Sequence, residues 1–324
     1  MTQSASLSRT LLLQRLADGQ FHSGEILGQE LGLSRASVSK HVKVLTELGL
    51  DIFSVTGKGY RLAKPLSLLS HKHIASELTL LNSSQVEVLN IIDSTNQYLK
   101  DLNRAKGNGY VCLAEAQTAG RGRHGRTWVS PYGASIYMSM FWSFQGGHQV
   151  ISGLSLVIGI AIVKALKGLD VDDVMLKWPN DVYLHGKKLA GVLIEVEGQL
   201  GAACDCVIGI GLNISLPSNK LEIDQPWTDL TKGTGKDFNR NTLAATLINE
   251  LVTILTQFEQ SGLEPFVEQW NTLDYFQQQS VKLLIGNKQL KGVACGINGD
   301  GALLLERNGQ VEAFHGGEIS VRAV

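Results

Sequence analysis

The sequence lacks long apolar runs, and this absence excludes several kinds of protein. Its 324 residues are 44% apolar and 18% charged, a balance typical of a globular protein and not of a disordered one. The most apolar stretch, residues 154–163, has about ten residues, roughly half of what a membrane-spanning helix needs. The amino-terminal segment has only three consecutive leucines, Leu11 to Leu13, too few for a signal peptide. We therefore expect no membrane association, two or three domains, and a buried helix at residues 154–163.

Cysteine is scarce, and neither sign of charge is in excess. The four cysteines, Cys112, Cys204, Cys206 and Cys295, form no CxxC pair. Their spacing argues against a structural zinc site and favours a reducing, cytoplasmic location. The formal net charge is −1, so no field of the whole protein attracts nucleic acid or a membrane. Contact with nucleic acid would have to come from a local basic patch.

One such patch lies near the amino terminus. Residues 35–64 hold six Lys or Arg against two acidic residues, a local net charge of +4. Ser23 and Ser34 are placed as N-caps, and Gly32 and Gly49 as helix ends. The pattern predicts three helices and a β-hairpin, at residues 7–16, 24–31, 35–48 and 51–62. Two short helices joined by Gly-Leu-Ser and followed by a hairpin indicate a winged helix-turn-helix.

The exposed face of the third predicted helix favours DNA binding. Val38, Val42 and Leu45 share one face, and small or basic residues on the opposite face suit entry into a major groove. Lys58 lies at the hairpin tip, where it would meet phosphate. The alternative is a packing module with a solvated basic face, but the basic excess and Lys58 favour DNA. The predicted interface consists of Ser34, Arg35, Ala36, Ser37, Ser39, Lys40, Lys43 and Lys58.

Composition changes twice along the rest of the chain. Residues 65–70 read as a linker. Residues 83–275 mix short strands with amphipathic helices, whereas from Val281 onward short apolar runs alternate with turn pairs such as Asn308-Gly309, which suggests a small β-barrel. We expect an α+β protein with three domains, at residues 1–65, 66–275 and 276–324.

The most unusual stretch is AGRGRHGRTW, residues 119–128. Its glycines match the G-x-G-x-x-G spelling of dinucleotide-binding folds, but such a loop opens a helix, and Pro131 prevents one here. No Gly-Lys-Ser/Thr follows, so the stretch is not a Walker A loop either. What remains is a loop whose glycines let backbone approach a ligand and whose Arg121, Arg123 and Arg126 suit phosphate or carboxylate. The alternative is a solvated basic turn or an RNA-binding stretch.

Three further motifs offer polar groups. Residues 93–97, DSTNQ, follow an apolar run and present hydroxyl and amide groups, or simply cap a helix. Residues 177–181, KWPND, gather polar side chains around a proline turn, with Asp181 either a metal ligand or an ordinary turn residue. Lys188, the last residue of a hairpin at 185–188, could stabilise developing negative charge or be merely solvated. The glycines of 207–214, VIGIGLNI, indicate close approach of a ligand or neighbour.

Taken together, DSTNQ, AGRGRHGRTW, KWPNDVY, GKKLAGVLIE, GIGLNI and GGEISVR resemble the motifs of bacterial biotin–protein ligases. With the helix-turn-helix in front, the chain resembles their bifunctional form, which is also the biotin operon repressor. The resemblance implies activation of biotin with ATP and Mg²⁺ to biotinyl-5′-AMP, then transfer to a lysine of biotin carboxyl carrier protein. It also implies a homodimer when the adenylate is bound, which binds the biotin operator. The implied fold is a winged helix-turn-helix, a mixed-sheet α/β ligase domain and an SH3-like β-barrel.

The resemblance also implies roles for particular residues. Lys188, Arg121 and Arg123 would be catalytic. His124 stands in the loop where relatives often have a more basic residue, which reduces the loop's charge at neutral pH. The nucleotide would meet Trp128, Lys177, Asn180 and Arg322. Biotin would be bound by Ser94, Thr95, Asn96, Gln117, Arg121, Gly122, Arg123 and Lys188.

Two other functions compete with this interpretation. A lipoate–protein ligase shares the fold and the two-step adenylate mechanism, but is not expected to carry this arginine loop or a DNA-binding front. A transcription factor that only senses a ligand would not need Lys188 and the arginine loop.

Adenylation needs no protein nucleophile, because AMP itself is a good leaving group. This agrees with the lack of a recognisable Ser/His/Asp set in the sequence.

Overall fold

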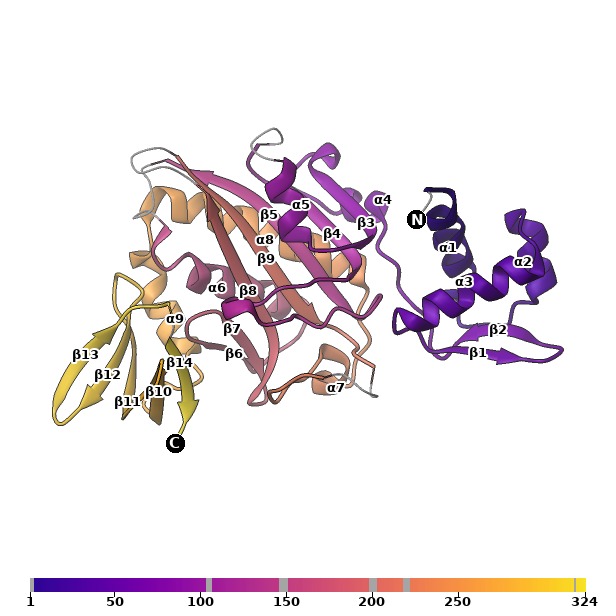
Figure 1. Cartoon of the computed structure of the whole chain (residues 1–324). Coiled ribbons are helices and arrows are strands. Elements are labelled where there is room, and N and C mark those ends of the chain that lie inside the picture. Colours follow the sequence, from indigo (N-terminus) through magenta and orange to yellow (C-terminus); the bar gives the residue numbers. More distant parts are fainter. Residues whose placement is uncertain (1–2, 103–106, 146–150, 198–202, 218–221, 318) are drawn as a thin grey trace.

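The computed structural model describes residues 3–102, 107–145, 151–197, 203–217, 222–317 and 319–324. Within these ranges the chain forms a helical module, a central sheet covered by helices, and a second, smaller sheet. Figure 1 shows the helical module and the smaller sheet at opposite ends of the central part. Among the described residues, no helix combines the length and apolar character that crossing a bilayer requires.

The amino-terminal module is the predicted helix-turn-helix with its hairpin. Ser23 Oγ accepts a hydrogen bond from Glu25 N at 3.2 Å, and Ser34 Oγ one from Ser37 N at 3.1 Å, so both predicted N-caps are confirmed. Gly32 ends the second helix in the left-handed conformation, at φ 63°. The elements are α1 (Gln3–Leu16), α2 (Gly24–Leu31), α3 (Arg35–Glu47), β1 (Ile52–Val55) and β2 (Gly59–Leu62).

The central sheet has seven strands in the order β3-β4-β5-β9-β8-β7-β6. Only β3 and β4 pair in parallel among these neighbours, and the rest are antiparallel, which confirms the expected mixed sheet. The strands are β3 (Val86–Ile92), β4 (Tyr110–Gln117), β5 (Ser135–Phe144), β6 (Val174–Lys177), β7 (Asp181–Leu184), β8 (Lys187–Glu197) and β9 (Cys204–Asn213).

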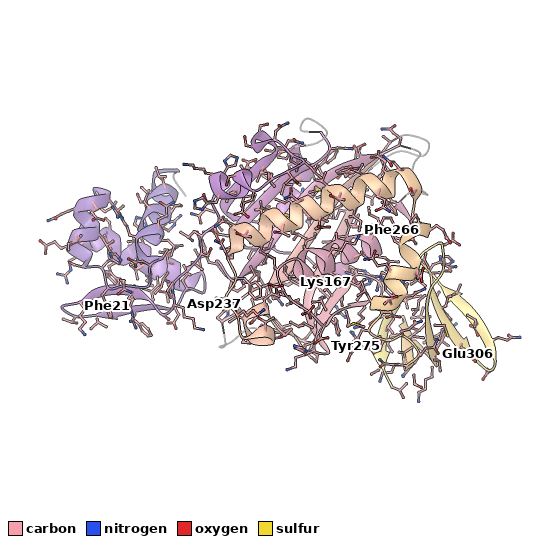
Figure 2. The ribbon with its side chains drawn as sticks, turned by 180° about the vertical axis from the view of Figure 1, so that it is seen from behind. Phe21, Lys167, Asp237, Phe266, Tyr275 and Glu306 are labelled. Carbon is pink, nitrogen blue, oxygen red and sulfur yellow. The ribbon has the colours of Figure 1, made fainter. Side chains whose placement is uncertain are left out.

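Two long helices cover one face of this sheet, whereas α5 (Thr95–Leu102) and the glycine-rich loop lie on the other. Residues 154–163 form the expected buried helix, α6 (Leu154–Lys167), which packs with α8 (Arg240–Ser261) against the sheet. Figure 2, seen from behind, shows α8 lying across the whole sheet. The remaining helices are α4 (His71–Ser76), α5 (Thr95–Leu102), α7 (Leu230–Thr234) and α9 (Val267–Leu273), with 3-10 turns at Ser83–Gln85, Arg123–Gly125 and Glu264–Phe266.

The carboxy-terminal part is a five-stranded antiparallel sheet. Its short strands agree with the sequence prediction. Its order, β13-β12-β11-β10-β14, leaves β13 and β14 as open edges, so closure into an SH3-like barrel is not confirmed. Turn pairs specify hairpins locally, but no local signal decides whether two edge strands meet. The strands are β10 (Ser280–Ile285), β11 (Lys288–Ile297), β12 (Leu303–Arg307), β13 (Gln310–Phe314) and β14 (Ile319–Ala323).

The predicted linker has no helix or strand and is held against the central sheet by a buried ion pair. Glu115 on β4 pairs with Arg240 at the start of α8, and both side chains are about 95% buried or more. Glu115 Oε1 accepts from Leu69 N at 2.6 Å, and Arg240 donates to the Ser67 carbonyl at 3.0 Å. The carboxy-terminal end of the linker, residues 67–70, therefore belongs to the central part and is not a loose tether.

Candidate functional site

One cavity gathers segments that lie far apart in the sequence. It is lined by the start of α5, the glycine-rich loop, the turn between β6 and β7, the strands β8 and β9, and β14 of the carboxy-terminal sheet. All residues predicted to contact biotin, nucleotide or metal line this cavity. They are Ser94, Thr95, Asn96, Gln117, Arg121, Gly122, Arg123, Trp128, Lys177, Asn180, Asp181, Lys188 and Arg322.

Hydrogen-bonding groups without charge make up one end of the cavity, which we call the polar end. β3 and β4 are parallel neighbours, so the segments after their carboxyl ends lie together. Thr95 N donates to Gln117 Oε1 at 2.9 Å. Ser94 Oγ accepts from Gln97 N at 3.4 Å, so the DSTNQ segment both caps α5 and lines the cavity.

A buried serine that sequence reasoning missed organises the polar end. Ser139 on β5 is fully buried. Its Oγ lies 2.7 Å from Thr95 Oγ1 and 2.5 Å from Asn96 Oδ1. The available signal was weak, because Ser139 is one of three serines in the strand sequence SIYMSMFWSF. Its partners are more than forty residues away in the sequence, so the contact itself had no local signature.

Glycines form the floor beneath the cavity, as the GIGLN segment predicted. A Cβ at Gly209 would lie 2.2 Å from Asn96 Oδ1, and one at Gly211 would lie 2.3 Å from the Trp128 ring. Any side chain there would collide, so Asn96 and Trp128 require glycine beneath them. The Nε1 of Trp128, a residue that lines the cavity, is buried and finds no acceptor among the described residues.

The other end of the cavity carries most of its positive charge, and we call it the cationic end. Lys188 Nζ lies 2.7 Å from Asp181 Oδ1 and 5.4 Å from the centre of the Trp128 ring. Arg123 Nη1 donates to Asn180 Oδ1 at 3.0 Å, and burial lowers the pKa of its guanidinium. Arg322 reaches this end from β14.

Lys177 is the most perturbed cation of this end. It is 4% exposed and donates to Tyr183 Oη at 2.9 Å. Burial lowers its pKa to about 8, helped by the positive charges of Arg322, Lys188 and Arg126 and opposed by Asp181. A perturbed titratable group inside a cleft is typical of a functional site.

The glycine-rich loop, residues 120–126, forms a compact turn and does not open a helix, which confirms that it is not a dinucleotide fingerprint. Gly122 N donates to Arg126 O at 2.7 Å, and Trp128 N to Gly120 O at 2.9 Å. His124 is exposed and left-handed, at φ 57°. Arg123 also donates to the Gly317 carbonyl, so the loop contacts the carboxy-terminal part.

Three carboxylates line the cavity, those of Asp181, Glu222 and Asp224. Within the described ranges, no three His, Cys, Asp or Glu side chains come together as a ready-made metal site. Asp181 lines the cavity beside Lys188. A magnesium ion usually takes one or two carboxylates and completes its shell with phosphate and water, so this donor set fits Mg²⁺ that arrives with a nucleotide.

A second candidate site is the outer surface of the helix-turn-helix. Of the residues predicted to meet DNA, all are exposed except Ser37, which is half-buried. Arg61 is one of the six basic residues of this segment but was not placed in the predicted interface; its guanidinium lies 4.9 Å from the Phe21 ring and 5.3 Å from the Phe53 ring. The hairpin register, which pairs Phe53 with Arg61, places the two side chains side by side. Figure 2 marks Phe21 on this module.

Family models match three successive segments of the chain. Residues 8–61 match a helix-turn-helix domain, residues 88–213 the biotin/lipoate A/B protein ligase family, and residues 279–322 the biotin protein ligase C-terminal domain. The three matches follow the helical module, the central sheet and the carboxy-terminal sheet in order.

Relatives and solved structures agree with these matches. The chain is 48% identical to the bifunctional ligase/repressor BirA of Escherichia coli, over 96% of each chain, and 32% identical to a biotin–[acetyl-CoA-carboxylase] ligase of Mycobacterium tuberculosis, over 72% of this chain and 88% of the relative. A biotin protein ligase from Aquifex aeolicus, solved with biotin and ATP, superposes with a TM-score of 0.66 at 29% identity, over 74% of this chain and 99% of that one. With its cavity, its helix-turn-helix and these matches, the chain belongs to the biotin–protein ligases, in the bifunctional form that combines ligase and repressor.

Proposed function

We infer that this protein joins biotin to ATP and transfers it to a protein lysine, and that it also represses transcription in response to biotin. In the first reaction the biotin carboxylate attacks the α-phosphate of ATP, giving biotinyl-5′-AMP and diphosphate. In the second, a lysine amine of biotin carboxyl carrier protein attacks the activated carbonyl, and AMP leaves. One observation carries this inference: a single cavity joins an uncharged hydrogen-bonding end to a cationic end.

The polar end suits the ureido ring of biotin. That ring has two N–H donors and one carbonyl acceptor, so its site must supply both kinds of partner in a place without charge. Ser94, Thr95, Asn96 and Gln117 supply hydroxyl and amide groups there. Their hydrogen bonds with one another and with Ser139 hold these groups in place before ligand arrives, which lowers the cost of ordering them on binding.

The cationic end suits the reacting groups. Bringing a carboxylate to a triphosphate places two anions together, and Lys188, Arg123 and Arg322 would offset their repulsion. We assign Lys188 and the loop arginines Arg121 and Arg123 as the principal catalytic side chains. Trp128, Lys177 and Asn180 would contact the nucleotide. The loop, once closed, would shield the reactive mixed anhydride from water.

The proposal includes Mg²⁺, because the carboxylate of Asp181 is a suitable ligand for it. A bound Mg²⁺ supplies charge neutralisation at the phosphate oxygens. Asp181 would hold it, and Lys188, the ion-pair partner of Asp181, would then be released towards the phosphate.

The proposal also includes a cytoplasmic location, which rests on the spacing of the cysteines.

The repressor half of the proposal rests on the helix-turn-helix. Its exposed residues Arg35, Lys40 and Lys43 on α3 would enter the major groove of the biotin operator. The hairpin, with Lys58 at its tip, would contact phosphate. We propose that the adenylate-bound protein is a homodimer, which would place two such modules on two half-sites.

Biotin-dependent exchange between ATP and labelled diphosphate tests the ligase directly. We expect exchange with biotin and much less with lipoate under the same conditions. Exchange that depends on lipoate alone would make the protein a lipoate–protein ligase. The absence of exchange with either acid would leave only a ligand-sensing transcription factor.

A further inference from the structure

A cluster behind the cavity connects the glycine-rich loop to the polar end. Its centre is Glu195 on β8, and its other members are Arg121, Gln97, Asn96 and Lys100. Arg121 Nη2 lies 3.1 Å and 2.9 Å from the two oxygens of Glu195. Arg121 Nη1 donates to Gln97 Oε1 at 3.1 Å. The first arginine of the loop is thus held by a carboxylate of the sheet and by an amide of α5.

The same carboxylate also holds a residue of the polar end. Asn96 Nδ2 donates to Glu195 Oε2 at 2.9 Å, and Lys100 Nζ lies 3.4 Å from Glu195 Oε1. With its amide nitrogen directed at Glu195, Asn96 presents its carbonyl oxygen to Ser139. The Leu193 carbonyl accepts from the same Nδ2 at 3.3 Å, so Glu195 and the Leu193 carbonyl together set which way the Asn96 amide points.

Burial and charge agree with a fixed, ionised carboxylate. The Glu195 side chain is 23% exposed. Burial alone would raise its pKa, but the hydrogen bonds from Asn96 and Arg121 and the charges of Arg121 and Lys100 outweigh burial and lower it. Among the described residues that line the cavity, Glu195 is absent, so it acts on the ligand only through its partners.

We propose that Glu195 is a positioning residue that couples closure of the glycine-rich loop to the orientation of Asn96. When the loop closes, Arg121 completes the charge pair, and the carboxylate is then held in the geometry that Asn96 requires. When the loop opens, Glu195 keeps only Asn96 and Lys100 and has more freedom to rotate. The proposal rests on the proposed function, because it assumes that Asn96 contacts biotin and that the loop covers the adenylate.

Glu197 provides a matched control. It lies two residues further along the same strand and shares the partner Lys100, also at 3.4 Å. It is 50% exposed, and in the part of the chain that the structure describes it forms no ion pair with Arg121. Glu195→Gln and Glu197→Gln therefore remove the same charge from the same strand, and only the first removes the partner of the loop.

The test is trypsin cleavage after Arg123 and Arg126 in the ligand-free protein, read by mass. We expect cleavage of Glu195→Gln to be about fivefold faster than that of the wild type, a modest effect because the Arg121 pair is partly exposed. The dissociation constant for biotin alone should rise by a similar factor, because Asn96 loses its charged acceptor. Glu197→Gln should stay within about twofold of wild type in both measurements.

A second variant separates the specific contact from a general loss of structure. Arg121→Gln removes the other partner of the same ion pair and should speed cleavage as much as Glu195→Gln does. The double variant should be cleaved no faster than either single variant. Three results would overturn the proposal. They are a Glu195→Gln variant with the cleavage rate and biotin affinity of the wild type, a Glu197→Gln variant that changes both as much as Glu195→Gln does, and additive effects on cleavage in the double variant. If Glu195→Gln does not fold, Arg121→Gln decides alone, and an unchanged cleavage rate refutes the pair. Cleavage of the ligand-free protein does not depend on ligase activity, so failure of the proposed function would appear separately, as absent diphosphate exchange in the wild type.

Discussion

At the scale of single residues, Lys188 carries the sharpest catalytic prediction. Its ammonium meets the most negative charge when the α-phosphorus becomes pentavalent, so its loss should affect the rate more than biotin binding. Lys188→Ala should lower the rate of adenylation by about 10²–10³-fold, with a much smaller change in the dissociation constant for biotin. Single-turnover formation of biotinyl-AMP measures this. Lys187→Ala, at the exposed neighbouring position, is the control, and near-normal turnover of Lys188→Ala would remove Lys188 from the catalytic side chains.

The lowered pKa of Lys177 leads us to predict that nucleotide binding depends on pH. Burial lowers its pKa from 10.5 to about 8, so Lys177 is charged below that pH and loses its proton as the pH rises through it. The cationic end then loses one positive charge, and its attraction for phosphate weakens. The KM for ATP should rise several-fold between pH 7 and pH 9. In Lys177→Met the KM should already be high at pH 7 and should change little over this range, whereas a pH profile like that of the wild type would assign the titration to another group.

At the scale of elements, the glycine-rich loop is the part expected to move. Three arginines in seven residues repel one another when no anion is present, and only some of that charge meets Glu195. Biotinyl-AMP should slow proteolysis within residues 120–126, because it supplies the missing negative charge and orders the loop. Limited proteolysis with and without the adenylate checks this prediction. Equal cleavage in the two states would contradict it.

The elements also divide into those that the sequence predicts and those that it does not. Caps and turns have local causes, so the helix ends predicted from Ser23, Ser34 and Gly32 in the amino-terminal module are correct. The cavity residues Thr95 and Lys188 were identified because they lie in motifs of the family. Ser139 lies outside those motifs, and Glu195 ends the motif GKKLAGVLIE without standing out there. Both matter through contacts with α5 or with the glycine-rich loop, which lie far away in the sequence.

At the scale of the whole molecule, removing residues 1–65 should abolish operator binding and leave a folded ligase. The remaining part keeps Leu69 and Ser67, with their contacts to Glu115 and Arg240. It loses the contact of Tyr132 N with Leu48 O, at 3.4 Å, just after the loop segment, so biotin binding should weaken but persist. The proposed boundary between residues 65 and 66 would be contradicted if a soluble truncated protein with cooperative thermal unfolding bound no biotin.

The coupling of the two halves follows from the number of DNA contacts. One helix-turn-helix module with six basic residues between positions 35 and 64 reaches only a limited set of phosphates. Each phosphate contact makes the logarithm of the affinity fall with the logarithm of salt concentration, by a slope of about 0.9. A dimer doubles the contacts and reads two half-sites. Ordering of the arginine loop by the adenylate would lower the entropic cost of assembling that dimer.

Titration of operator DNA with and without biotin plus ATP tests this account most directly, because it requires both the ligase site and the helix-turn-helix. With biotin and ATP, the account predicts tight binding that depends steeply on protein concentration, and a salt slope larger than one module can give. Without them, binding should be weak. Equal operator affinity in the two states, or a monomer that binds as tightly as the dimer, would contradict the account.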